Sequence, residues 1–268
     1  MKKLKKLLWG ATVPLALLAV WYISTFTLTV TRVELESDKI NTPVNIVQIT
    51  DLHGAVFGKS NHRLINKIKE QSPHIIVATG DMYTAGDEGG KTRAVTLLTA
   101  LAELCPVYYV NGEHDNSASF RKALIAGGVR VLDYKTESLD INGNPITLYG
   151  IDNVYYSPTF DLYNEFTPDR ERFNLLAAHI CNPSAFADFA ADLTICGDTH
   201  GGQIRLPFVG ALYDESRDLW LPERYNGVYM KGLYPLGEEQ LFVSSGLGNR
   251  PYPVRLFNRP EVALIVLK

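Results

Sequence analysis

Acidic and imidazole side chains recur in this chain directly after short apolar runs. The stretch Ile195–Gln203 is the clearest case: the apolar run ends at Cys196, a glycine follows, and Asp198 and His200 come two positions apart. A strand that ends in such a loop can present ligands to a metal ion. Imidazole and carboxylate ligands without thiolates suit Mn, Zn or Fe. The stretch therefore predicts one part of a metal site.

The same pattern occurs at four earlier places in the chain. In each, a β-rich run passes through Gly or Thr to Asp, Glu or His, or ends directly on His, at Ile46–His53, Ile75–Asp81, Val107–Asp115 and Leu175–His179. In open α/β sheets the functional crevice lies beyond the carboxyl ends of the strands. We therefore expect five strand ends to deliver carboxylates and imidazoles to one place.

Five motifs in this order resemble those of the calcineurin-like metallophosphoesterases. They are Asp51-x-His53, Gly80-Asp81, Gly112-x-His114-Asp115, an isolated His179 and Gly197-x-x-His200-Gly201-Gly202-Gln203. The Gly-Gly-Gln, the N-terminal apolar segment and the tail from Pro253 to Leu267 are most similar to the membrane-associated branch called UDP-2,3-diacylglucosamine hydrolase-like. The resemblance begins at Val44. It implies an α/β fold, a four-layer α/β/β/α sandwich of two packed mixed sheets flanked by helices.

The resemblance also implies a role for each matched residue. The first of two metal ions would be bound by Asp51, His53, Asp81 and His200. Asp81 would bridge to a second ion, which also takes Glu113, His179 and Asp198. His114 would protonate the leaving oxygen or grip the phosphate. We expect two divalent ions, drawn from Mn, Zn, Fe and Mg with Mn favoured, because two nearby cations can hold the attacking and leaving oxygens of a phosphoryl displacement.

Two positions depart from the family pattern. Glu113 stands where the family has asparagine, and Asp198 stands where it has histidine. With two divalent ions the family's two carboxylates leave a site charge of +2, whereas the four carboxylates of this chain leave zero. Such a site repels a dianionic monoester more than a monoanionic diester, which favours phosphodiester or pyrophosphate links over monoesters. The extra anions also favour harder Mn or Mg at the second position.

The function that follows is a metal-dependent phosphoesterase, with a lipid-linked or envelope phosphoester as the expected substrate. One alternative is a catalytically impaired family member that binds one metal and serves as a structural or ligand-binding envelope protein, because substituted ligands can mark the loss of the second ion. Another is a nuclease or cyclic-nucleotide diesterase. The formal net charge of -3 and the lack of an evident basic groove make nucleic acid an unexpected partner.

The N-terminus predicts a membrane anchor over residues 1–30, followed by the metallophosphoesterase domain over residues 31–268. Four lysines among residues 2–6 precede a run from Leu7 to about Val30 that contains no charged residue. A basic flank and an apolar run of about 18 residues can span a bilayer with the basic side in the cytoplasm. The alternative is a cleaved signal peptide. The catalytic domain is expected outside the cytoplasm in either case.

The remaining sequence patterns concern the secondary structure and the cysteines. Strand and helix signals alternate up to Gly127, which is typical of a doubly wound sheet. Residues 27–36 alternate apolar with polar and predict a first strand, and Asn142-Gly143 predicts a hairpin turn. Three cysteines, at 105, 181 and 196, show no paired spacing and are interpreted as buried free thiols, with one disulfide left open.

The two departures generate a test. Restoring the family pattern with Glu113→Asn and Asp198→His should raise monoesterase activity at neutral pH, because the site regains positive charge and bound water loses its proton more easily. The rate with p-nitrophenyl phosphate, compared between the double variant and the parent, measures the effect. An unchanged rate would contradict the electrostatic explanation.

Overall fold

Two six-stranded sheets form the body of the protein. The computed structural model describes residues 2–152, 166–187, 189, 191–214, 217–250 and 252–268. The first sheet has the order β1 (Thr29–Leu35), β16 (Glu261–Leu267), β2 (Val44–Ile49), β3 (Ile75–Thr79), β4 (Val107–Val110) and β5 (Arg130–Val131). Its strands β2 to β5 are parallel, and β16 runs antiparallel to β2. The carboxyl ends of β2, β3 and β4 therefore meet at one edge.

The second sheet is also mixed. Its order is β14 (Gly232–Leu236), β15 (Glu239–Val243), β9 (Leu193–Cys196), β8 (Phe173–Ala177), β7 (Asn144–Gly150) and β6 (Lys135–Ile141). Strands β7, β8, β9 and β15 are parallel, whereas β6 and β14 are antiparallel edges. Two small ribbons lie between β9 and β14 in the chain: β10 (Arg205–Leu206) with β11 (Gly210–Ala211), and β12 (Tyr213–Asp214) with β13 (Leu219–Trp220).

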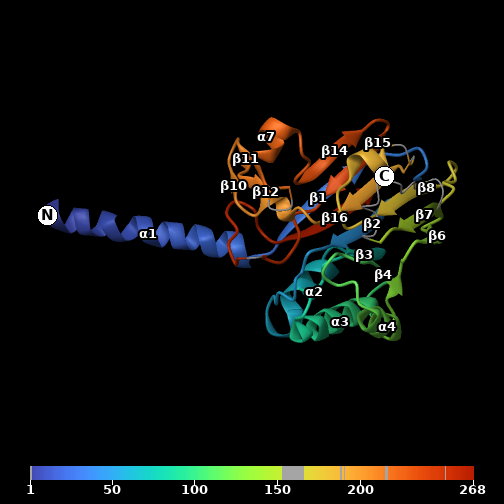
Figure 1. Ribbon diagram of the computed structural model, residues 1–268, viewed down its shortest axis with the longest axis horizontal. Coiled ribbons are helices and arrows are strands. Elements are labelled where there is room, and N and C mark those ends of the chain that lie inside the picture. Colours follow the sequence, from blue (N-terminus) through green and yellow to red (C-terminus); the bar gives the residue numbers. More distant parts are fainter. Residues whose placement is uncertain (1, 153–165, 188, 190, 215–216, 251) are drawn as a thin grey trace.

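Helices cover the outer side of the first sheet. They are α2 (His62–Lys69), α3 (Glu88–Ala102) and α4 (Ala118–Ala126), and they lie together below the sheets in Figure 1. The other helical segments are α1 (Lys2–Phe26), η1 (Lys59–Asn61), α6 (Pro183–Phe186), η3 (His200–Gly202) and α7 (Pro222–Asn226). On the second sheet, the described residues place only the short α6 over the outer face, beside buried Phe186 and Phe189.

Alternation of side chains along the strands separates a core between the two sheets from one core on the outer face of each sheet. On β2, Val47 packs in the cluster that includes the helices, whereas Ile46 packs in the cluster between the sheets. Leu175 and Ile195 reach the same middle cluster from the second sheet. Because a strand sends successive side chains to opposite faces, strands covered on both sides read as nearly continuous apolar runs. Two packed mixed sheets with helices, as predicted, are confirmed.

The predicted hairpin is confirmed. Strands β6 and β7 pair antiparallel across Asn142 and Gly143. Both turn residues have positive φ, 57° and 80°. This is the backbone that a two-residue turn needs to match the right-handed twist of the strands, and asparagine followed by glycine adopts it readily.

The cysteines are free thiols. Cys181 and Cys196 are buried and Cys105 is half-buried. Burial raises the pKa of the Cys105 thiol to about 11. A thiol that stays protonated at neutral pH is a poor nucleophile. The interpretation as buried free thiols is confirmed for Cys181 and Cys196, whereas Cys105 is only half-buried.

Helix α1 projects away from the sheets as a single rod (Figure 1). The predicted strand after it is confirmed as β1, so Thr29 and Val30, expected in the anchor, belong to the sheet. Where side chains are described, no helix is both long and apolar enough to cross a membrane, and the structure does not support the expected membrane-spanning segment.

The end of α1 is tied to the loop before β16. Arg255 N donates to Thr25 Oγ1 over 3.1 Å, and Thr25 Oγ1 donates back to the Arg255 carbonyl over 3.2 Å. Phe257 N donates to Ser24 Oγ over 3.2 Å. The helix is therefore fixed to the domain at its C-terminal end.

A buried carboxylate joins the two sheets. Glu261 starts β16 in the first sheet, and its Oε2 accepts hydrogen bonds from Ser245 N over 2.8 Å and from Ser244 Oγ over 3.1 Å, just beyond β15 of the second sheet. Lys231 Nζ lies 3.2 Å from Glu261 Oε1, and Thr31 donates to the same oxygen. Burial opposes ionisation, but Lys231 and the hydrogen bonds outweigh it and lower the pKa of Glu261.

This carboxylate predicts acid sensitivity. Because its pKa is depressed on folding, Glu261 stabilises the fold above its unfolded pKa of about 4.3 and loses that contribution as the pH falls through its folded pKa. Glu261→Gln should cost about 3 kcal/mol at neutral pH, because it leaves Lys231 without its charge partner, and should flatten the pH dependence below about 4. Urea unfolding at several pH values measures both effects.

The matched control is Glu36→Gln, which removes an exposed carboxylate just beyond β1. It should leave the free energy of unfolding within about 0.5 kcal/mol of the parent. Equal losses in the two variants, or an unchanged acid limb in Glu261→Gln, would contradict the role assigned to Glu261.

Candidate metal centre

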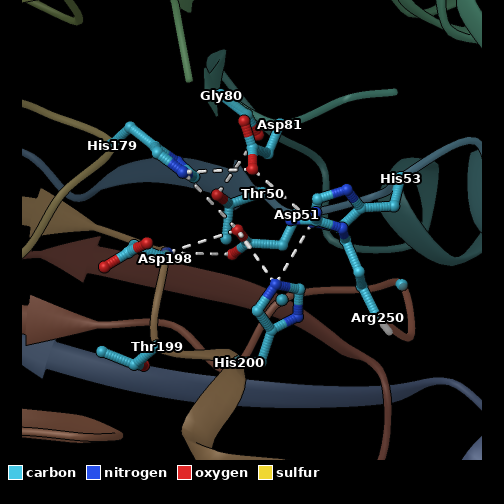
Figure 2. A network of polar contacts seen from close by, with 12 residues as sticks. Thr50, Asp51, His53, Gly80, Asp81, His179, Asp198, Thr199, His200 and Arg250 are labelled. Carbon is cyan, nitrogen blue, oxygen red and sulfur yellow. Dashed lines mark hydrogen bonds and ion pairs between the residues drawn. The ribbon is translucent and has the colours of Figure 1, made fainter. Parts of the chain in front are cut away.

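Five of the predicted ligand residues lie at strand exits with left-handed backbone. Their φ angles are 51° for Asp51, 46° for His53, 53° for Asp81, 71° for Asp198 and 49° for His200. Positive φ is uncommon outside glycine, although Asp and His tolerate it better than most residues. Such strained positions cluster at functional sites. They turn the chain sharply after β2, β3 and β9, so that the side chains face one another (Figure 2).

A first group of close donors contains Asp51, His53 and His200. The ligand atoms of these three residues all lie within 4.8 Å of one another. The Nε2 atoms of His53 and His200 are 3.2 Å apart, and His200 Nε2 is 3.8 Å from Asp51 Oδ1. When two nitrogens bind the same ion, each at about 2.1 Å, they lie about 3.0–3.4 Å apart for ligand angles between octahedral and tetrahedral. The two imidazoles have the spacing of ligands to a shared cation.

A second group contains Asp51, Asp81 and His179. His179 Nδ1 lies 2.7 Å from the Thr79 carbonyl and must donate to it, so in the neutral ring Nε2 carries the lone pair. That nitrogen is buried and has no hydrogen-bond partner in the described part of the chain. It lies 3.5 Å from Asp81 Oδ2 and 3.9 Å from Asp51 Oδ1. A nitrogen lone pair facing two carboxylate oxygens fits a cation between them.

The two groups are joined by carboxylates. Asp81 Oδ2 is 3.6 Å from His53 Nε2 and 3.5 Å from His179 Nε2, so one oxygen lies between the two imidazoles. Asp51 belongs to both groups. A carboxylate between two sets of ligands can bridge two ions, and this is the position that the resemblance implies for Asp81.

The pKa values of the five donors in the two groups, Asp51, His53, Asp81, His179 and His200, are all shifted. Burial raises the pKa of Asp51 to about 7 and lowers that of His53 to about 3, and it holds the pKa of His200 well below the usual value. Burial opposes the charged forms of His179 and Asp81, but their mutual attraction outweighs it, raising the pKa of His179 and lowering that of Asp81. A cation can take the place of the shared proton, because both partners then keep their ligand lone pairs.

Comparison with known proteins identifies the family. The model of the calcineurin-like phosphoesterase family matches residues 44–202, which is more than half of the chain and includes all five donors. This chain belongs to that family. It is a phosphoester hydrolase with candidate ligands for divalent metal ions, as predicted.

Several relatives are similar over most of their length. The uncharacterized metallophosphoesterase YkuE of Bacillus subtilis is 30% identical over 83% of this chain and 78% of its own. Phosphodiesterase YaeI of Escherichia coli is 30% identical over 74% of this chain and 72% of its own. An uncharacterized metallophosphoesterase of Aquifex aeolicus is 28% identical over 92% of this chain and 94% of its own.

The residues that depart from the family pattern lie beside the donors. Asp198 N donates to both carboxylate oxygens of Asp51 over 3.3 Å, and burial raises the pKa of the Asp198 carboxyl to about 6. Glu113 is exposed. Neither residue belongs to the two close groups of donors, so their role as ligands of the second metal stays a prediction.

His114 lies at the edge of the metallophosphoesterase site. Its ring meets that of His53 edge to face at 5.4 Å, and its Nε2 is 4.0 Å from Asp81 Oδ2. Its backbone N donates to Asp81 Oδ1 over 2.9 Å, which fixes the Asp81 carboxylate. The side chain is half-buried and reachable from solvent, as a group that meets substrate must be.

Other residues orient the donors without joining them. Thr84 Oγ1 lies 3.2 Å from His53 Nδ1, which leaves His53 Nε2 to face the site. Asp115 is fully buried, and its two oxygens accept from Gly112 N and Met82 N, each over 2.7 Å. Asp115 thereby fastens the loop after β4 to the loop after β3. Partners that orient ligands in this way are worth about 10- to 100-fold in metal affinity.

Sequence reasoning missed Arg250. Its guanidinium contacts His114 Nε2 at the site. It lies in the loop after β15, the sixth strand to end beside the site, where Ser244-Ser245-Gly246 interrupts the apolar run much as glycine does elsewhere. A search for basic as well as acidic residues after strand ends could have found it.

Asp115 provides a test of the supporting shell. Asp115→Asn exchanges one acceptor oxygen for a donor that faces another N–H, which should cost about 2 kcal/mol and lower Tm by about 4–8 °C. The amount of metal that the variant retains after dialysis should also fall. The exposed Asp38→Asn serves as control and should match the parent. A variant with parental Tm and metal content would show that Asp115 does not hold the two loops together.

Proposed function

We propose that this chain is a two-metal phosphodiesterase. The observation that carries the proposal is the convergence of Asp51, Asp81 and three imidazoles from both sheets into two groups of donors joined by carboxylates. Two metal ions, when bound, supply Lewis-acid polarisation of phosphoryl oxygens and lower the pKa of water. Asp51, His53 and His200 would hold one ion, and Asp81 and His179, together with Asp51, would hold the other.

The chain's own residues do the remaining work. The fixed strand exits keep the donors in place without reorganisation, which is how a preorganised site stabilises charge that develops in the transition state. His114 lies beside Asp81, half-buried and within reach of solvent, and would face the leaving oxygen. Its proton donation to that oxygen is part of the proposal.

Charge supports diesters over monoesters. Glu113 and Asp198 add two carboxylates near the donors, and Asp198 lies close enough to hydrogen-bond Asp51 through its backbone. A phosphodiester carries one negative charge and a phosphomonoester two, so the diester is repelled less. The name of the Escherichia coli relative, phosphodiesterase, agrees with this choice.

The substrate's setting is proposed from the sequence. The resemblance to the UDP-2,3-diacylglucosamine hydrolase-like branch and the uncharged run that follows the N-terminal lysines support a lipid-linked or envelope substrate with a diester or pyrophosphate link. They also support a catalytic domain held at a membrane outside the cytoplasm.

Metal analysis with a substrate panel tests the proposal. The full chain loaded with Mn should hold two ions and hydrolyse bis(p-nitrophenyl) phosphate faster than p-nitrophenyl phosphate. Asp81→Asn should lower kcat by about 100-fold or more, because a carboxylate between the two groups serves both ions and metal catalysis is worth several kcal/mol. Asp38→Asn is the matched control.

The rival function predicts a different outcome. A family member that serves as a one-metal binding or structural protein would hold one ion tightly and turn over neither substrate. That result, obtained with Mn, Zn, Fe and Mg in turn, would contradict the proposed enzymatic function. Faster turnover of the monoester would keep the enzyme but overturn the preference for diesters.

A further inference from the structure

The loop after β15 is docked on the backbone of a metal donor. Leu247 N donates to the Thr50 carbonyl over 3.0 Å, and Gly248 N donates to the Asp51 carbonyl over 2.6 Å. A Cβ on Gly248 would lie 2.4 Å from the Leu52 carbonyl oxygen, so only glycine permits this approach. The loop thus follows the exit of β2 closely, and the residues just after it are held beside the site.

A buried cation holds the same loop from behind. Arg255 is fully buried, and its Nη2 donates to the carbonyls of Ser245 over 2.8 Å and Gly248 over 2.6 Å. Its Nε donates to the Gly248 carbonyl and to Asn249 Oδ1, each over 3.1 Å. Burial lowers the pKa of Arg255 to about 10, which still leaves it charged at neutral pH. The backbone that leads into Arg250 is therefore well fixed.

Arg250 directs a positive charge into the site from this loop. The residue is exposed, and its guanidinium contacts His114 Nε2. Figure 2 shows Arg250 on the side of the site where the imidazole of His53 lies. Among the described residues no carboxylate lies within 4 Å of it.

Two other arginines near the site are already paired. Arg205 Nη2 lies 3.0 Å from Glu223 Oε1, and its Nη1 donates to the Gly201 carbonyl. Arg217 Nη1 lies 2.9 Å from Asp214 Oδ2. Arg250 differs from both because its contact is an imidazole nitrogen and not a carboxylate.

That contact is a weak substitute for an anion. A guanidinium has no lone pair, so it donates and His114 Nε2 accepts. Both bonds have an ionised donor, but only a phosphoryl oxygen also brings a negative charge, and the planar fork of arginine fits two oxygens of a phosphoryl group. A phosphoryl oxygen that enters the site therefore competes well for Arg250. When it does, His114 Nε2 loses the guanidinium and its lone pair is free to carry the proton that the leaving oxygen takes up.

We propose that Arg250 binds a non-bridging phosphoryl oxygen of the substrate and exchanges His114 for that oxygen as the substrate enters. The proposal rests on the proposed function and deepens it. Where four carboxylates offset two divalent ions, Arg250 adds the single positive charge that complements the single negative charge of a phosphodiester.

Phosphate binding tests the proposal apart from turnover. Isothermal titration of the Mn-loaded full chain with inorganic phosphate should give a Kd that is about 10- to 100-fold weaker in Arg250→Ala, the loss expected for charge-assisted hydrogen bonds. Arg250→Lys should fall between, because it keeps the charge but not the fork. Metal content and Tm should stay at the parental values in both variants. KM for bis(p-nitrophenyl) phosphate should rise in step with the Kd.

The control is Arg224→Ala, an exposed arginine on α7 whose guanidinium lies over the Tyr225 ring. Its phosphate Kd should equal that of the parent. A parental phosphate Kd in Arg250→Ala overturns the proposal, and if kcat alone falls, Arg250 only positions His114. A parent protein that holds metal but binds no phosphate also overturns it. Phosphate binding that depends on Arg250 without any turnover would uphold this inference while the hydrolytic function fails.

Discussion

The structure depends on a concentration of hydrogen-bond acceptors that cannot satisfy one another. Asp51 and Asp81 are buried, and the imidazoles of His53 and His179 face them with nitrogen atoms. Burial of unpaired charge is costly, and a shared proton relieves only part of that cost. Divalent cations bound in the two groups of donors would satisfy these atoms. The same unfavourable arrangement that opposes folding of the metal-free chain is therefore what gives the site its affinity for metal.

Both sheets are needed to build this arrangement. Asp51 and Asp81 come from parallel strands of the first sheet, whereas His179 and His200 follow strands of the second. The packing of the sheets, together with Glu261 across them, sets the distances between donors. The loop after β15 then brings Arg250 to the solvent side of the same donors. The packing of the two sheets therefore sets the geometry of the site, and substitutions that loosen the packing should alter the distances between the donors.

Much of the fold and of the site was predictable from local pattern. Apolar runs of four to six residues predicted β2, β3, β4, β8 and β9, because strands covered on both faces must be apolar throughout. Asn142-Gly143 predicted its hairpin because the turn needs positive φ. The N-terminal segment was harder, because an uncharged run does not reveal where a helix ends and a strand such as β1 begins. Arg250 escaped prediction because an exposed arginine in a loop has no periodic signature.

Residue type and order by themselves determined which strands end in carboxylates or imidazoles, and that Glu113 and Asp198 bring two carboxylates that the family pattern lacks. Only the tertiary structure decided which of these side chains meet. It brings Asp51, His53, Asp81, His179 and His200 within reach of one another and leaves Glu113 exposed beside them. The reason is physical. Side-chain chemistry is a local property of the chain, whereas distances between residues about 150 positions apart arise from strand register and sheet packing.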